Sequence, residues 1–501
     1  MELQKKSYRY YAPAAAGRTQ YEESGDMIVP DSYPDAKAIR GSAGEVFLKE
    51  KTVQNDRILI SGVIRAAVFY EPEEGEGVRE LVIPVSFAHI EEAKGLSSGD
   101  QLHVEAKIHS LHGALLNPRK LSVQAKIDLS YEAYSQREAE LVTDVDSEPE
   151  ERIQLRRRSV QPGGVELLLE KTMPIVDSVD CSGMGKAAEV VVWDTEILEE
   201  DVKLIAGKAV VKGSLRAKLL LTGLDGKITP KICTFPFSQI IEVPDLTDDD
   251  ALACRFSLQG LDFTLDEESE GGRYDVNGSL FLVMEGRKKR EFSVVCDLYS
   301  AAFPHESDIR LLYLPVEPGM QRVTREGSES VETEQRPAEI LFARGALSPG
   351  EREEGTIGAE LSLSVFYRDS ADGACTAEKV VPVTFETNGW TGDRWQMTTP
   401  EVSAELMEDG SVRIAWRCGC ALMDGGQASV PQVTEARLLE EPLDPGKNAP
   451  ALIMRWGSAG DALWDMAKAY HTTEGEIREA NELPDSETLT SDGILLIPLM
   501  R

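Results

Sequence analysis

The chain has 501 residues, of which 42% are hydrophobic, and a formal net charge of −34. A chain of this length normally divides into several domains, and its apolar content is sufficient for each to bury a core. An acidic chain is poorly suited to bind nucleic acid or anionic lipid headgroups, because both need a basic surface. These properties predict a multidomain protein that binds no nucleic acid and does not insert directly into a membrane.

The N-terminal stretch 1–26 lacks an apolar segment, so we expect it to be flexible and to carry no secretory signal. No run of about eighteen apolar residues occurs, which argues against a transmembrane helix. The seven cysteines are scattered and odd in number. This is typical of reduced thiols rather than of a disulfide framework, and it favours a cytoplasmic location.

Three segments of the chain share one strand–turn–strand pattern. Each has a strand entered near a glycine, a turn rich in glycine and acidic residues, and a second strand that ends at a phenylalanine. The glycines are Gly62, Gly213 and Gly358, and the phenylalanines are Phe87, Phe237 and Phe385. Apolar and polar residues alternate in these strands, as in half-buried strands. Repetition at this length indicates one domain copied three times rather than a solenoid.

The repeats predict a mainly β protein made of three β-sandwich or barrel-like domains. The expected domains are 27–135, 173–305 and 329–441, with a charged linker at 136–172, a second linker at 306–328 and a proline-rich spacer at 442–450. The third copy is the most diverged, because its glycine is offset by one residue. Trp390 and Trp395 also fall in what should be a loop of that copy.

Residues 451–501 show a strand–helix–helix–strand pattern. Thr473-Glu474-Gly475-Glu476 has the Thr-x-x-Glu form of a capping box, which predicts the start of the second helix. The block Gly460-Asp461-Ala462-Leu463-Trp464, with Asn481 and Ile497-Pro498 at their spacings, resembles the LysM domain. That resemblance implies a small βααβ fold and a module that binds N-acetylglucosamine polymers.

The β repeats resemble the SPOCS domain of spore-coat proteins from endospore-forming bacteria. Three such repeats followed by a LysM domain are similar to the SipL-like family of spore coat assembly proteins. The resemblance implies a morphogenetic scaffold of the mother-cell cytoplasm, located at the forespore surface and spore coat. It also implies a protein partner, the ATPase that polymerises into the coat basement layer, with the LysM domain contributing to that contact.

The LysM-like segment allows two kinds of ligand. In glycan-binding members a shallow groove lies between two loops, which here are about 457–462 and 483–493. The usual Gly-Asp-Thr-Leu becomes Gly460-Asp461-Ala462-Leu463, and this change loses a hydroxyl that could bond a sugar. We therefore favour protein docking. The alternative is a cell-wall-associated protein that binds peptidoglycan or chitin-like N-acetylglucosamine polymers, and a purely structural role is a third interpretation.

The candidate partner-binding residues lie on the expected surface of this segment. They are Trp456, Ser458, Asp461, Ala462, Asn481 and Leu483. Trp456 is expected to be exposed, because protein interfaces favour aromatic anchors. Trp464, at the start of the first helix, is expected to lie in the core.

We expect no enzymatic activity, catalytic residue, cofactor or metal site. His103, His109 and His112 fall close together, but on one strand His112 points away from the other two. No neighbouring cysteine or His-Glu-x-x-His pattern supports a metal site, so we interpret them as solvated strand residues. No nucleophile–base pair is recognisable. Only a pocket lined by paired carboxylates would suggest an enzyme active on wall glycans.

Overall fold

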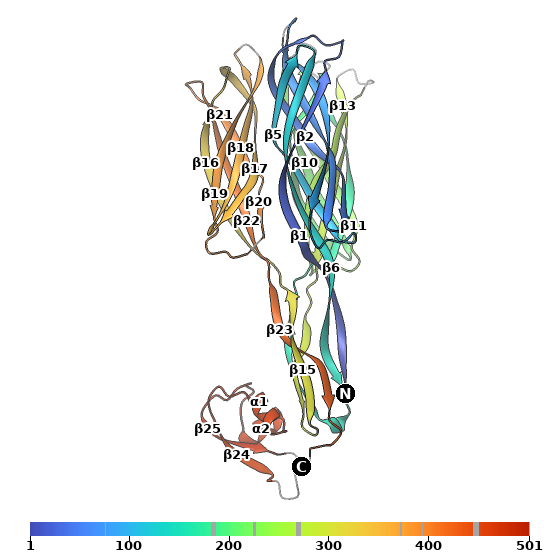
Figure 1. Ribbon diagram of the computed structural model, residues 1–501, viewed down its shortest axis with the longest axis vertical. Coiled ribbons are helices and arrows are strands. Elements are labelled where there is room, and N and C mark those ends of the chain that lie inside the picture. Colours follow the sequence, from blue (N-terminus) through green and yellow to red (C-terminus); the bar gives the residue numbers. More distant parts are fainter. Residues whose placement is uncertain are drawn as a thin grey trace.

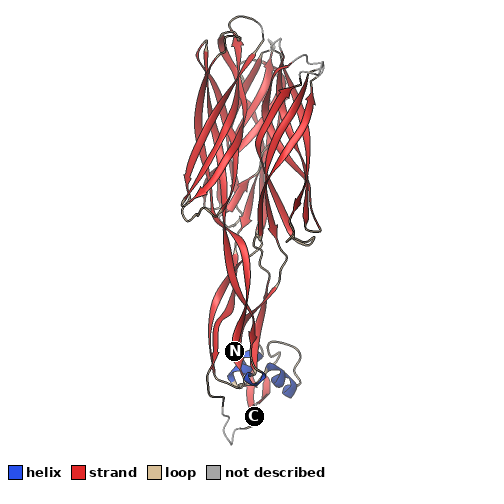
Figure 2. Ribbon diagram, turned by 90° about the vertical axis from the view of Figure 1, so that its right-hand side faces the viewer, coloured by secondary structure: helices blue, strands red, loops and turns tan. Residues whose placement is uncertain are grey.

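A computed structural model describes residues 1–75, 77–181, 187–223, 227–266, 272–370, 373–392, 394–443 and 450–499. The chain forms a head of three β units side by side, a narrower stalk of strands below it, and a small domain at the far end of the stalk (Figure 1). The α-helices lie in that terminal domain, and strands build the head and stalk (Figure 2). The expectation of a mainly β chain with a small C-terminal βααβ domain is confirmed.

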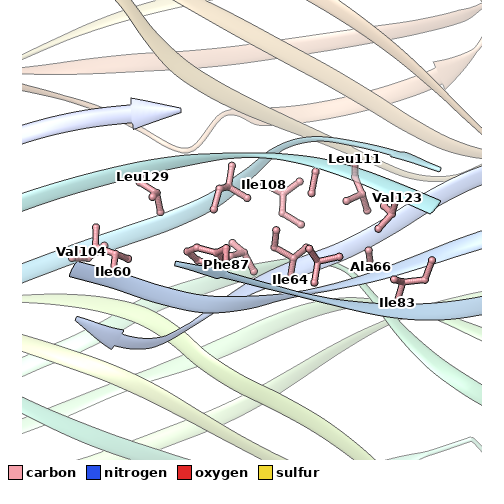
Figure 3. Packing of buried hydrophobic residues seen from close by; sticks show 14 of the residues in the cluster. Ile60, Ile64, Ala66, Ile83, Phe87, Val104, Ile108, Leu111, Val123 and Leu129 are labelled. Atoms are coloured by element: carbon pink, nitrogen blue, oxygen red, sulfur yellow. The ribbon is translucent and has the colours of Figure 1, made fainter. Parts of the chain in front are cut away.

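The first unit is a sandwich of two antiparallel sheets. Its strands are β1 (Glu2–Ile28), β2 (Ala36–Gln54), β3 (Arg57–Pro72), β4 (Arg79–Glu92), β5 (Gln101–Asn117) and β6 (Lys120–Asp146). One sheet has the order β2–β3–β4 and the other β1–β6–β5. Alternate residues of both sheets point inward, and Ile64, Phe87 and Val104 lie in the core between them (Figure 3).

The second and third units repeat this plan. The second unit contains β8 (Leu167–Asp180), β9 (Ala187–Ile205), β10 (Lys208–Gly223), β11 (Ile228–Glu242), β12 (Ala251–Leu265) and β13 (Arg273–Arg287). The third contains β16 (Gly319–Val331), β17 (Pro337–Glu353), β18 (Thr356–Asp369), β19 (Ala374–Glu386), β20 (Arg394–Met397), β21 (Glu401–Leu406) and β22 (Val412–Asp424). Their sheets are β9–β10–β11 with β8–β13–β12, and β17–β18–β19 with β22 pairing to β16, β20 and β21. In the third unit, two short strands thus stand where the others have one long strand.

The repeated glycine and phenylalanine form a cross-strand pair. Gly62 lies opposite Phe87, and Gly213 lies opposite Phe237. A Cβ atom at Gly62 would lie 2.6 Å from the ring of Phe87, and one at Gly213 would lie 2.5 Å from the ring of Phe237. Only glycine leaves room for each ring to lie across the neighbouring backbone, which explains why the two residues recur together.

The third unit lacks this pair. Ile357, and not Gly358, lies opposite Phe385, although the phenylalanine is still fully buried. The offset glycine seen in the sequence therefore marks a different pairing of side chains, rather than the same pair moved by one residue.

Each unit is connected to a two-stranded ribbon of the stalk. In the first unit the ribbon is the continuation of the first and last strands, and in the other two it is formed by the strand before the unit and the strand after it. These ribbons are the lower half of β1 with β6, β7 (Ile153–Val160) with β14 (Phe292–Ser300), and β15 (His305–Pro315) with β23 (Gln427–Leu438). Tyr8, Leu141, Val294 and Leu314 form a core that joins all three ribbons. The short 3-10 helix η1 (Pro149–Glu151) turns the chain at the base of the stalk.

Three expectations about flexible segments are wrong. Residues 1–26 are not a loose terminus, because β1 pairs with β6 along its whole length and Tyr8 is 1% exposed. The expected linkers at 136–172 and 306–328 contain stalk and head strands. Their many charged residues look like those of a linker, because a narrow stalk exposes much of its surface to solvent. Arg157 and Asp144, for example, form an ion pair at 2.6 Å on this surface. Most of the spacer expected at 442–450 lies outside the described residues.

The three units meet at one apolar cluster, which we call the junction cluster. Phe69 of the first unit, Trp193 of the second and Phe366 of the third lie at its centre. The ring centroids of Phe69 and Trp193 lie 5.3 and 5.2 Å from that of Phe366. The Arg344 guanidinium stacks 4.9 Å from the Trp193 ring centroid and donates to carbonyl oxygens of Trp193 (3.1 Å) and Gly44 (3.5 Å). One arginine of the third unit thus contacts both other units.

Replacing Phe366 with alanine tests the junction cluster. Phe366→Ala should destabilise the chain by about 3–5 kcal/mol, because a fully buried ring would leave a cavity shared by three units. The midpoint of urea unfolding measures the loss. Ile232→Ala on β11 is the control, since that side chain is 59% exposed. Equal midpoints for the two variants would show that the units are held together elsewhere.

Glu45 on β2 places a carboxyl group beside the junction. Thr195 Oγ donates to it at 2.9 Å, so the group joins the first and second units. Burial, and then the charge of Asp194, raises the pKa of Glu45 from its usual 4.5 to about 7. Between those two values the folded chain holds a proton that the unfolded chain releases. The free energy of unfolding therefore falls as pH rises through this window.

Glu45→Gln should remove this contribution to the pH dependence. The variant and the wild type should be similarly stable near pH 5, where both side chains are neutral, and the variant should gain on the order of 2–3 kcal/mol by pH 8. Urea unfolding across this pH range measures the difference. Glu196→Gln is the control, because Glu196 pairs with Arg216 at the surface. A constant difference between Glu45→Gln and wild type from pH 5 to 8 would contradict the assignment.

Candidate functional site

The terminal domain has the order β24 (Leu452–Gly457), α1 (Leu463–Ala469), α2 (Glu474–Asn481) and β25 (Gly493–Pro498). The predicted capping box is present at the start of α2. Thr473 Oγ accepts from the Glu476 backbone N–H at 3.1 Å, and the Glu476 carboxylate accepts from the Thr473 N–H at 3.2 Å. Two orphan backbone donors are thereby satisfied, which fixes where this short helix begins.

One face of the β24–β25 hairpin is apolar and uncovered; we call it the outer LysM face. Alternate residues of paired strands share a face, and Trp456 lies opposite Ile494. The exposed fractions are 45% for Leu452, 72% for Met454, 64% for Trp456 and 66% for Ile494. The expected exposure of Trp456 is confirmed. Large apolar side chains gathered on one small face are typical of an interaction surface.

The loop residues among the candidates mainly organise the loops themselves. The Asp461 carboxylate accepts from the Ser458 backbone N–H at 3.1 Å, and the Asp461 N–H donates to the Ser458 carbonyl at 3.0 Å. Ala462 forms an isolated bridge with Thr488, so the two loops that would frame a glycan groove are joined through their backbones. Ser458 is exposed beside this bridge.

Asn481 and Leu483 hold the domain together. The Asn481 side chain donates to the carbonyl oxygens of Ile477 (2.7 Å) and Leu496 (2.6 Å), and it accepts from the Leu496 N–H at 2.7 Å. Its amide is therefore fully used in joining α2 to β25. Leu483 packs against the domain core. Neither side chain therefore belongs to the outer LysM face.

The terminal domain is fixed to the base of the stalk. Asp297 on β14 accepts from Trp464 Nε1 at 2.8 Å and from Lys468 Nζ at 2.6 Å. The Tyr299 hydroxyl donates to the Thr472 carbonyl at 2.8 Å, and its ring meets Trp464 edge-on at 4.9 Å. Trp464 is buried, as expected, but part of its environment comes from the stalk. No local sequence pattern predicts this contact, because the partners are more than 160 residues apart.

Two of the three histidines are buried rather than solvated, whereas His112 is exposed as expected. His103 and His109 are each 5% exposed, because the third unit covers this face of β5. His109 Nδ1 lies 2.7 Å from Ser348 Oγ and 3.3 Å from Asp128. In a Ser-His-Asp triad the serine and the aspartate use different ring nitrogens, whereas here both contact Nδ1. Ser348 is also 2% exposed, so this cluster joins two units and presents no nucleophile.

A cavity between the first and third units contains a pair of carboxylates, Glu105 and Glu132. Burial would raise both pKa values. His103, whose Nε2 lies 3.5 Å from Glu105, and the charge of Lys107 outweigh burial at Glu105, as the charges of Arg255 and Arg394 do at Glu132, and each pKa is lowered to about 2. Glycoside hydrolysis needs one carboxyl that is protonated near neutral pH. The pair lacks such an acid, so it does not support an enzyme active on glycans.

Comparison with known families identifies two segments. Residues 186–266, which fall in the second unit, match the family described as SipL, SPOCS domain, and residues 458–498 match the LysM domain. The chain carries a SipL-type SPOCS domain and a LysM domain. Searches of curated proteins and of solved structures returned no match.

These matches support a sporulation-related protein with a module of a class that binds peptidoglycan glycans or proteins. Both matched domains are of binding or scaffold types rather than enzymatic ones. Among the residues that the structure describes, none of the helices has the length and apolar character needed to cross a membrane.

Asp297→Ala tests the contact between the LysM domain and the stalk. The substitution leaves the Trp464 indole N–H and the Lys468 ammonium without their shared acceptor, so the domain should detach from the stalk. The radius of gyration from small-angle scattering should rise, and hydrogen exchange in α1 should quicken. Asp308→Ala is the control, because Asp308 lies on the stalk but pairs with Arg310. An unchanged radius for Asp297→Ala would mean that the contact does not position the domain.

Proposed function

We propose that the chain is a non-enzymatic scaffold in endospore coat assembly. In this proposal it tethers the ATPase of the coat basement layer to the forespore surface from the mother-cell cytoplasm. The LysM domain is the module that docks the protein partner. The SPOCS and LysM matches support the setting, and the altered Gly460-Asp461-Ala462-Leu463 loop supports a protein rather than a glycan as the ligand.

The outer LysM face is the observation that carries this proposal. Trp456 and Met454 are large, exposed and adjacent on one face, and interfaces favour aromatic and methionine side chains as anchors. The LysM domain also lies at the opposite end of the stalk from the head (Figure 1). A partner bound to this face would be held away from whatever the head contacts, which suits a tether.

Glycan binding remains the second candidate because the LysM match supports it directly. The loop residues Ser458 and Gly460 are exposed, so a sugar chain could reach the framing loops without contacting the outer LysM face. Protein docking and glycan binding would thus use different surfaces of one small domain. A substitution on one surface should impair one kind of binding and leave the other intact.

Trp456→Ala in the full-length chain tests protein docking. Recovery of the purified coat ATPase should fall at least tenfold in a pull-down, as expected for loss of an aromatic anchor worth about 2 kcal/mol. A chain that ends at Glu441 should recover no more than background. Trp416→Ala is the matched control, because Trp416 lies on β22 of the third unit. Equal recovery by the wild type and the chain ending at Glu441 would remove the LysM domain from the proposed role.

Titration of the same proteins with chitin oligomers and peptidoglycan fragments tests the second candidate. Under protein docking we expect no saturable heat from either glycan. Saturable binding that survives Trp456→Ala, together with unchanged recovery of the ATPase by that variant, would favour the glycan and overturn the protein-docking proposal.

A further inference from the structure

A polar cavity lies between the first and third units, and Arg255 of the second unit also lines it. Its volume is about 310 Å³, within the range of small-molecule sites. The first unit contributes His103, Glu105 and Glu132 to the lining, the second contributes Arg255, and the third contributes Arg394 and Trp395. A second cavity of about 420 Å³ shares Arg18 and Glu105 with it. We call the first of these the charged cavity.

Positive charge exceeds negative charge in this lining, although the chain as a whole is strongly acidic. Arg18, Arg255 and Arg394 face Glu105 and Glu132. Arg255 and Arg394 both bind Glu132, at 2.5 and 3.3 Å, and Arg255 also pairs with the buried carboxylate of Glu285. One carboxylate is thus shared between two guanidinium groups. Arg18 has no carboxylate within ion-pair distance among the described residues. Its guanidinium lies over the Trp395 ring at 5.4 Å, and its Nη2 donates to the Trp395 carbonyl oxygen.

The polar atoms left without a partner in this lining include two obligatory donors. Arg394 Nε and Trp395 Nε1 are shielded from solvent and have no hydrogen-bond partner among the described residues. His103 is 5% exposed; its Nε2 lies 3.5 Å from Glu105, and its Nδ1 has no partner. Buried donors are normally satisfied, so a ligand that bonds here should bring acceptors.

The departure of the third unit from the repeat creates this lining. In the first two units the corresponding strand is continuous, as β5 and β12 are. The third unit has the short strands β20 and β21 instead, and β20 carries both Arg394 and Trp395. Trp395, which the sequence pattern places in a loop, therefore lines the wall of the charged cavity. Trp390 lies nearby, with its ring centroid 6.5 Å from that of Trp395.

We propose that the charged cavity binds a small oxyanion, namely the carboxylate or phosphate group of a small molecule. Guanidinium groups match the paired oxygens of such anions, and the unpaired indole and guanidinium donors supply further hydrogen bonds. The carboxylates of Glu132 and Glu285 keep Arg255 and Arg394 in place, so Arg18 is the guanidinium of this lining that has no carboxylate partner among the described residues. Binding at this position joins the first and third units, so it should also stabilise the head.

Titration of the full-length chain with sodium phosphate and with sodium citrate tests this proposal, with sodium chloride at matched ionic strength as the reference. At least one of the two anions should give saturable heat and raise the unfolding temperature beyond the effect of chloride. Tighter binding of phosphate would assign a phosphate-bearing ligand, and tighter binding of citrate a carboxylate-bearing one. If neither anion exceeds chloride, the cavity holds only water and the proposal fails.

Trp395→Phe locates the binding. The variant keeps an aromatic ring beneath Arg18 but loses the Nε1 donor, so affinity for the anion should fall about tenfold. Trp416→Phe is the matched control, because its indole nitrogen also lacks a partner but does not line the cavity. Its affinity should stay unchanged.

Arg394→Lys is the second variant, and it covers the case in which Trp395→Phe folds poorly. It keeps the positive charge but removes Nε and the planar fork, and it should weaken binding by a similar factor. Equal affinity in the wild type and Arg394→Lys, or equal losses in Trp395→Phe and Trp416→Phe, would place the anion elsewhere and overturn the assignment.

Discussion

The contact among Phe69, Trp193 and Phe366 is the constraint on which the rest of the head depends. Each aromatic ring comes from a different unit, so no unit can complete this core alone. Arg344 adds a directional element, because it stacks on Trp193 and donates to backbone oxygens of both other units. Hydrophobic burial supplies the attraction, and the guanidinium fixes how the units are oriented. The polar interface between the first and third units, with His109, Ser348 and the charged cavity, exists because this cluster brings those faces together.

The stalk converts that arrangement into a molecule with two distinct ends. Its ribbons bring the chain back to the base after each unit, and Asp297 and Tyr299 fix the LysM domain there. Trp464 serves two partners at once, since its ring completes the LysM core and its indole N–H binds the stalk. The position of the outer LysM face relative to the head is therefore set by a few polar contacts rather than by a loose connection.

Local signals in the sequence predicted the features that depend on near neighbours. The capping box at Thr473 and the βααβ order need only a short stretch of chain. The recurrence of Gly62 and Phe87 was also visible in the sequence, although their cross-strand pairing came from the structure. The stalk could not be predicted, because β1 pairs with β6 across more than a hundred residues and its exposed face looks like a linker. The buried state of His109 depends on Ser348, 239 residues away, so the strand pattern alone gave the wrong environment. Asn481 was recognised from its spacing, but only the structure shows that its amide joins α2 to β25.

The long antiparallel ribbons of the stalk have a mechanical consequence. Their hydrogen bonds lie perpendicular to the strands, whereas a pull between the LysM domain and the head would act along them. Such a load shears many bonds together instead of opening them one after another. The stalk should therefore resist extension far better than a flexible connector of equal length. A force applied at one end, by a moving or growing attachment, would be transmitted to the other end with little extension of the stalk.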